Sequence, residues 1–217
     1  MRRTLFLATS LVSLLFLATS LVAGCGGKAG EESAGGKVEP PMGDKATASQ
    51  AYKACRSEIE KLEASGGKLS MITGRMVDVD GLAEAWDFML LGPASGGDSL
   101  LENHVGWEKG EVKTWSYGEQ TTMGYENVPQ YSYLFHPISG EWLDSPEIAR
   151  KFASERPPSE ASPGGMQMTL RYYADPSQGV EGTVWVVSWE GEQPTAVGMM
   201  LLNAGSGEPL KASPKLY

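Results

Sequence analysis

The chain has 217 residues, with 27 acidic and 18 basic side chains and a formal net charge of −9 at neutral pH. An acidic protein repels nucleic acid and anionic lipid head groups, so the composition argues against a nucleic-acid-binding role. Hydrophobic residues make up 41% of the chain, which is ordinary for globular proteins, and the length suits one domain or two small ones.

Residues 1–24 have the organisation of a secretory signal, with basic residues before an apolar run that ends in small residues. The segment LVAGC at 21–25 resembles the lipobox of bacterial lipoproteins. That resemblance implies cleavage before Cys25 and lipid on its thiol, which would hold the protein at the cell membrane or outer envelope, on the extracytoplasmic side. A plain signal anchor is the alternative, because the run is long enough to span a bilayer.

Residues 25–45 are mostly Gly, Ser, Pro, Lys and Glu. Such a composition cannot contribute to a core, so we expect a flexible tether that holds a folded domain off the membrane.

The first helix is predicted over 47–65, where apolar residues recur at helical spacing, and Gly66 ends it. Cys55 lies on the apolar stripe and, once Cys25 is lipidated, has no partner for a disulfide. We therefore expect a buried, inert thiol; a reactive or ligating thiol is the alternative.

A strand is predicted over 68–79 and another over 84–91, separated by DVDG at 78–81. That tetrapeptide faintly resembles a calcium loop but lacks the later ligands, so a hairpin turn is preferred. An insertion near 92–128 is expected to add a hairpin that turns at Lys109-Gly110, and to carry a contact surface. A further strand is predicted over 129–135, before SGEWL.

The second half repeats this order. A helix is predicted over 145–156, capped by Ser145, and three strands follow over 165–176, 182–191 and 195–204, the last leading into SGEPL. We therefore predict an α+β fold of two helix-on-antiparallel-sheet units, 46–143 and 144–217. A single α+β domain with two unrelated SGE turns is the alternative.

The segment MMLLNAGSGEPL at 199–210 resembles the last strand and turn of PepSY domains: Ala204, Gly207 and Glu208 match, while Asn203 and Ser206 stand for Asp and Thr. LFHPISGEWL at 134–143 is a looser version. The resemblance implies a helix packed on a curved antiparallel sheet, in a cystatin-like arrangement, and proteins that regulate peptidases or mediate contacts. It transfers no catalytic residue.

The sequence contains no HExxH, CxxC, GxSxG or P-loop motif, so no catalytic residue, cofactor or metal site is predicted. Thioethers bind Cu(I), and the strand methionines are the residues that could do so: Met166, Met168, Met199 and Met200. Core packing is the preferred interpretation, because Met168 and Leu170 continue one face of a strand.

Trp86 and Trp185 are expected to pack between helix and sheet. The remaining aromatic residues are candidates for an exposed binding surface, because Trp and Tyr are enriched at such sites: Trp107, Trp115, Tyr117, Trp142 and Trp189. The alternative is that they only cover the far face of the sheet.

The sequence thus predicts a lipid-anchored, non-catalytic module that binds a protein or peptide, with a peptidase as one possible partner. A lipoprotein that binds a small ligand or a metal is the second hypothesis.

Overall fold

The computed structural model describes residues 43–158, 165–190 and 199–211. The predicted signal peptide, Cys25 and nearly all of the predicted tether lie outside these residues. No helix in the described part of the chain is long and apolar enough to cross a membrane.

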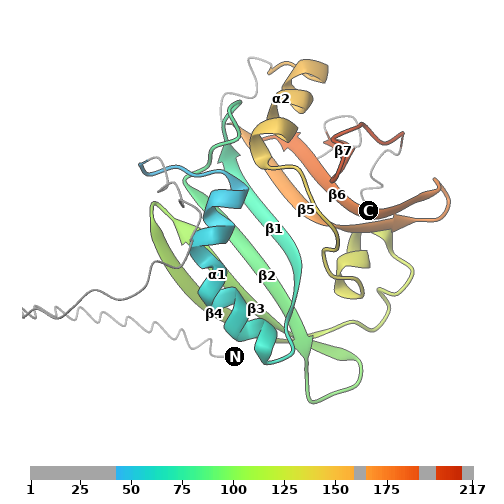
Figure 1. Ribbon diagram of the computed structural model, residues 1–217. Coiled ribbons are helices and arrows are strands. Elements are labelled where there is room, and N and C mark those ends of the chain that lie inside the picture. Colours follow the sequence, from blue (N-terminus) through green and yellow to red (C-terminus); the bar gives the residue numbers. More distant parts are fainter. Residues whose placement is uncertain (1–42, 159–164, 191–198, 212–217) are drawn as a thin grey trace, which may run out of the picture. The chain divides into compact units, whose positions relative to one another are not determined.

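The fold is α+β, as predicted, and it is built on one antiparallel sheet of seven strands in the order β4-β3-β2-β1-β5-β6-β7 (Figure 1). The strands are β1 (Lys68–Val77), β2 (Ala85–Pro93), β3 (Ser99–Glu108), β4 (Glu111–Thr121), β5 (Met166–Asp175), β6 (Val180–Trp189) and β7 (Met199–Asn203). Helix α1 (Ala48–Ala64) precedes β1–β4, and helix α2 (Ser145–Glu155) precedes β5–β7. The two strand series meet where β1 pairs with β5.

Both helices form where local signals predict them. The Thr47 hydroxyl accepts a hydrogen bond from the Gln50 backbone amide, and the Gln50 side-chain oxygen accepts one from the Thr47 backbone amide. The two bonds form a complete capping box. Asp144, rather than the predicted Ser145, is the N-cap of α2, because its carboxylate accepts from the Ser145 amide. The same carboxylate also accepts from the amide of Ser49, so one residue holds the first turns of both helices together.

The helices cover one face of the sheet and bury the larger of two hydrophobic clusters. Ala51, Cys55 and Ile59 of α1 and Phe152 of α2 belong to the same hydrophobic cluster. Trp86 and Trp185 lie in this cluster, as predicted. The indole of Trp86 lies against the backbone of Gly74 in β1, and its Nε1 donates to the carbonyl of Ala46 at 2.8 Å.

The thiol of Cys55 is fully buried, as predicted, and burial raises its pKa to about 12. At neutral pH it is therefore a neutral thiol in the core. The 78–81 segment is a turn in which the Asp78 carboxylate accepts from the amides of Asp80 and Leu82, as the hairpin prediction requires.

The predicted hairpin in the insertion is β3 and β4, and Lys109 and Gly110 turn it with positive φ angles of 48° and 88°. It is not an appendage, however. β3 pairs along its whole length with β2, and Val105 and Trp107 are core residues. The contact surface cannot therefore be separated from the scaffold in the way the sequence suggested.

The strand predicted over 129–135 is wrong: Pro129–Leu134 is a 3-10 helix, η1. Pro129 has no amide to donate to a strand partner and suits the first helical position. The two SGE segments consequently do not end equivalent strands. The first lies in a loop before α2 and the second follows β7, but they lie next to each other, because the Leu143 amide donates to the Ala204 carbonyl at 2.8 Å.

The two outer edges of the sheet differ. Along β7, residues 208–210 return beside the strand, since the Asn203 amide donates to Glu208 and the Leu210 amide donates to Leu201. Along β4, no described residue forms a strand on the outer side. β4 is exposed over almost its whole length.

Candidate functional site

On the face of the sheet opposite the helices, η1 packs against β5, and Tyr173, Val184, Val186 and Leu201 form a small buried cluster. Over β1–β4 the described residues add no second layer of helices or strands, and the side chains form rows across the strands. One row runs from Lys113 past Gly106 to Asp87, Thr73 and Thr169. The register continues this row to β6 and β7 with the apolar pair Val186 and Leu201. Charged, hydroxyl and apolar groups therefore follow one another across all seven strands.

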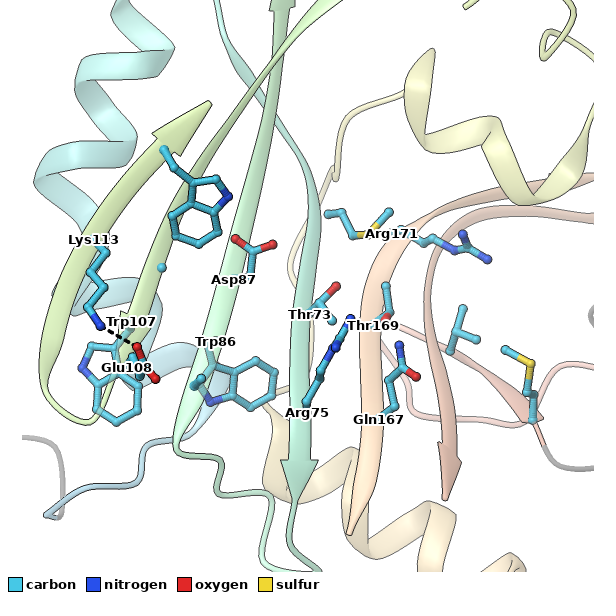
Figure 2. A pocket seen from close by; sticks show the side chains of 16 residues that line it. Thr73, Arg75, Trp86, Asp87, Trp107, Glu108, Lys113, Gln167, Thr169 and Arg171 are labelled. Carbon is cyan, nitrogen blue, oxygen red and sulfur yellow. Dashed lines mark hydrogen bonds and ion pairs between the residues drawn. The ribbon is translucent and has the colours of Figure 1, made fainter. Parts of the chain in front are cut away.

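A pocket of about 580 Å³ lies on this face (Figure 2). Its lining comes from every strand: Met71, Thr73, Arg75, Ala85, Trp86, Asp87, Gly106, Trp107, Glu108, Lys113, Trp115, Gln167, Thr169, Arg171, Val186 and Met199. This volume lies within the range of ligand-binding pockets, and the mixture of apolar walls with few polar groups is typical of them.

The centre of the pocket is a polar cluster on the two middle strands. Thr73 of β1 pairs with Thr169 of β5, and Arg75 and Gln167 lie two residues away along the same strands. Figure 2 shows the Arg75 side chain extending along the sheet toward Thr169. In the described part of the chain, no hydrogen bond or ion pair engages the side chains of these four residues.

A β-bulge follows Arg75 in β1. Met76 has a φ of 54°, and the register with β5 shifts between Gly74 and Val77. Arg75 shares the open face with Thr73 through the normal alternation of a strand, and the extra residue after it lets Val77 enter the core. Strain of this kind in a non-glycine residue is often found at functional sites.

Arg171 lines the pocket beside this cluster, but its guanidinium is directed toward η1. Its Nη1 donates to the Gln130 carbonyl at 2.9 Å, and the ring of Tyr133 lies 5.7 Å away. Burial lowers the pKa of Arg171, and no carboxylate among the described residues pairs with it. Arg171 therefore anchors η1 over the end of the sheet and adds uncompensated positive charge to the pocket.

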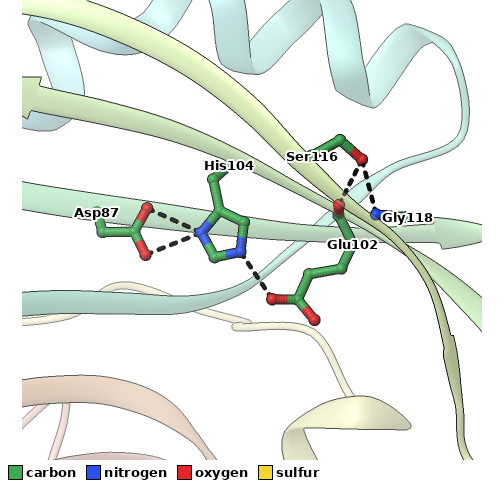
Figure 3. Close-up of polar contacts among 5 residues, drawn as sticks. All are labelled: Asp87, Glu102, His104, Ser116 and Gly118. Carbon is green, nitrogen blue, oxygen red and sulfur yellow. Dashed lines mark hydrogen bonds and ion pairs between the residues drawn. The ribbon is translucent and has the colours of Figure 1, made fainter. Parts of the chain in front are cut away.

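On the β2–β4 side of the pocket, a histidine lies between two carboxylates and contacts the lining residue Asp87 (Figure 3). His104 Nδ1 lies 2.9 Å from both Asp87 oxygens, and Nε2 lies 2.8 Å from Glu102 Oε1. Burial disfavours the charged ring, but the two hydrogen bonds outweigh it and raise the pKa of His104. When the ring is protonated, both of its nitrogens donate to the two carboxylates, and these contacts fix the orientation of Asp87.

Trp115 and Tyr117, two of the predicted binding residues, flank this histidine. The indole of Trp115 stacks on His104 with ring centroids 5.1 Å apart, and Tyr117 meets the ring edge-on at the same distance. Trp115 is 38% exposed and Tyr117 is 65% exposed. Gly106 makes room for the indole, because a Cβ there would lie 2.7 Å from it.

The other predicted binding residues are not exposed on this face, although Trp107 forms part of the pocket lining. Trp107 is 1% exposed and Trp189 is 4% exposed, so the prediction that they belong to an exposed surface is wrong. Each lies two residues from a core residue on the same face of its strand, Val105 for Trp107 and Val187 for Trp189. Trp142 is half-buried between Tyr52 and Trp185 on the helix side of the sheet, away from the main pocket.

Sequence reasoning missed the central cluster. Its signal is the alternation in KLSMITGRMV and MQMTLRYYAD, where Thr73 and Arg75, and Gln167 and Thr169, occupy one face of each strand. Both strands were predicted, but their pairing was not, so the four groups could not be brought together.

Three of the four strand methionines pack in or against the core, as preferred, because Met200 also contacts the main cluster. Met166 and Met168 are core residues, whereas Met199 lines the pocket on the opposite face. Among the described His, Cys, Asp and Glu side chains, no group of three or more could hold a metal ion.

No known family model, curated protein or solved structure matches the chain.

Proposed function

We propose that the protein is a lipid-anchored, extracytoplasmic binding module that contacts a protein or peptide through the open face of its sheet and catalyses no reaction. The anchor part of the proposal rests on the signal-like residues 1–24 and on the lipobox-like segment that ends at Cys25. The binding part rests on one observation: a pocket that crosses all seven strands contains polar groups that have no partner in the described structure.

We further propose that α1 with β1–β4 and α2 with β5–β7 are two related, PepSY-like units joined at β1 and β5. Each consists of a helix followed by consecutive antiparallel strands, which supports a common origin. Residues 199–210 resemble the last strand and turn of PepSY domains more closely than residues 134–143 do. A peptidase is the partner class that this relationship suggests.

Photo-crosslinking in the membranes of the native host tests the binding surface. A photoreactive amino acid at Tyr117 lies on the open face and is well exposed, whereas one at Lys53 lies on the exposed side of α1. We expect a crosslinked partner from position 117 and none from position 53. Equal crosslinking from both positions, or a crosslink from Lys53 alone, would contradict the proposal.

The size of the pocket favours a small-ligand carrier as the second candidate, because about 580 Å³ can hold a drug-sized molecule. Native mass spectrometry of the chain purified in detergent from its host separates the two functions. A retained small molecule that is lost in a Thr169→Trp variant would favour the carrier.

A further inference from the structure

The strongest feature that the proposed function leaves open is the chemistry of the group bound at the centre of the pocket. Four side chains converge there from β1 and β5: Arg75, Thr73, Thr169 and Gln167. A guanidinium only donates, hydroxyls and amides can donate, and none of the four has a partner among the described residues. Together they form a set of hydrogen-bond donors without an acceptor.

The charge balance identifies that acceptor as an anion. Lys113 pairs with Glu108, and Asp87 shares His104 with Glu102, so Asp87 keeps its negative charge. Among the described residues no carboxylate pairs with Arg75 or Arg171, and the lining therefore holds three cationic side chains against two carboxylates. This local positive excess occurs in a chain whose formal net charge is −9, so the pocket attracts a charge that the rest of the surface repels.

The anion carries a single charge. The Asp87 carboxylate lies in the same cross-strand row as Thr73 and would repel a dianion such as a phosphate monoester. A carboxylate carries one charge and two acceptor oxygens, which a guanidinium can bind in a bidentate fork. The two threonine hydroxyls and the Gln167 amide can bind the lone pairs that remain.

The ligand that carries this carboxylate is elongated and partly apolar. The pocket is lined from Lys113 on β4 to Met199 on β7, and six inter-strand spacings of ~4.8 Å give about 29 Å. An extended peptide of about eight residues has this length. Because the cluster lies on the middle strands, the carboxylate belongs near the middle of such a peptide, with apolar neighbours over Val186 and Met199.

We therefore infer that the open face binds an extended peptide segment that carries an Asp or Glu side chain at its centre, held by Arg75 with Thr73, Thr169 and Gln167. This inference rests on the proposed binding function and adds the chemical class of the partner segment. Arg75 is the decisive residue because it is exposed and has no structural partner, so its replacement does not disturb the fold.

Affinity selection with peptide libraries tests this. The full chain, purified in detergent and immobilised, is offered two pools of acetylated and amidated heptapeptides of mixed sequence, with Glu fixed at the central position in one and Gln in the other. A third pool has central Gln and a free C-terminal carboxylate. We expect the central-Glu pool to be retained about tenfold more than the other two. Retention of the third pool equal to that of the first would mean that the site binds a chain terminus, and would overturn the inference.

Variants of the same chain locate the effect. Arg75→Gln is expected to remove the preference for the central-Glu pool, and Arg75→Lys to keep part of it, because lysine supplies charge without the fork. Arg150→Gln is the matched control on α2, on the opposite side of the sheet, and should leave the preference unchanged. A preference that survives Arg75→Gln would also overturn the inference.

Separate outcomes reject the central carboxylate, the peptide ligand and the proposed binding surface. Equal retention of the Glu and Gln pools would reject the carboxylate while leaving peptide binding intact. No retention of any pool, together with a partner crosslinked at Tyr117, would reject the peptide ligand and leave the binding surface intact. No retention and no crosslink would reject both.

Discussion

Gly74 lies in the middle of β1, and the six-membered ring of the Trp86 indole occupies the space where a side chain would be. A Cβ added there would lie 2.5 Å from the nearest ring atom, closer than any real contact allows. The Gly74→Ala substitution must therefore displace a ring that is buried in the core and hydrogen-bonded to the Ala46 carbonyl. Such overpacking costs about 1–3 kcal/mol. Loss of the hydrogen bond adds about 1 kcal/mol.

We thus expect Gly74→Ala to lower the free energy of unfolding by about 3 kcal/mol, which corresponds to a fall of about 6–12 °C in Tm for a domain of this size. Urea unfolding of the purified chain, followed by tryptophan fluorescence, measures this. Gly92→Ala in β2 is the matched control, because the nearest atom to its added Cβ, Gly67 Cα, is 3.5 Å away. That substitution should change stability by less than about 1 kcal/mol.

A double-mutant cycle shows whether the indole is the cause. In a Trp86→Leu background the ring is gone, so adding Gly74→Ala should cost almost nothing further. If Gly74→Ala is no more destabilising than Gly92→Ala, or if its cost persists without the indole, the packing argument is wrong.

Three further outcomes are expected. In a Cys25→Ser chain, a thiol reagent should label Cys55 much more slowly in the native than in the urea-unfolded state, because burial raises the pKa of this thiol to about 12; equal rates would mean that it is accessible. The same Cys25→Ser substitution should move the protein out of the detergent phase in Triton phase separation or leave an uncleaved precursor, and normal maturation with membrane retention would contradict the lipobox. The pKa of His104 in the folded state is raised above 6.5, so its contribution to stability should be complete below about pH 6.5 and be lost as pH rises through the folded pKa. In His104→Gln this part of the pH dependence of the unfolding free energy should disappear. An unchanged pH profile would refute the role given to His104.

The parts of the fold that depend on neighbours in sequence could be predicted. The apolar stripe around Cys55, the helix stop at Gly66 and the Lys109-Gly110 turn are local signals, and they predicted α1 and the β3–β4 hairpin. Helix α2 was also predicted, with its N-cap placed one residue late. The sequence around 129–135 misled because its alternating aromatics imitate a strand. In the structure Tyr131 packs on Tyr125, and Tyr133 packs on Arg171. The alternating aromatic residues therefore find contacts within the loop and on β5, although the segment is not a strand.

The site could be predicted only in part, because it depends on which strands pair. Trp115 and Tyr117 were identified from their residue types, and they flank His104. The central cluster depends on the pairing of β1 with β5 across about 90 residues of intervening chain, which no local pattern reveals. The bulge at Met76 that brings Val77 into the core is likewise a consequence of tertiary pairing.

The unequal edges of the sheet limit how the protein could associate with itself. A fibre of strand-paired molecules requires two open edges on every subunit, one for each neighbour. In the described part of the chain, residues 208–210 occupy the edge at β7 and leave only β4 open. Two copies joined along β4 would use up both open edges, so strand pairing stops at a closed, two-fold dimer. The proposed lipid anchor would crowd copies of the chain on a membrane, where the three-residue return beside the last strand would prevent polymerisation through strand pairing.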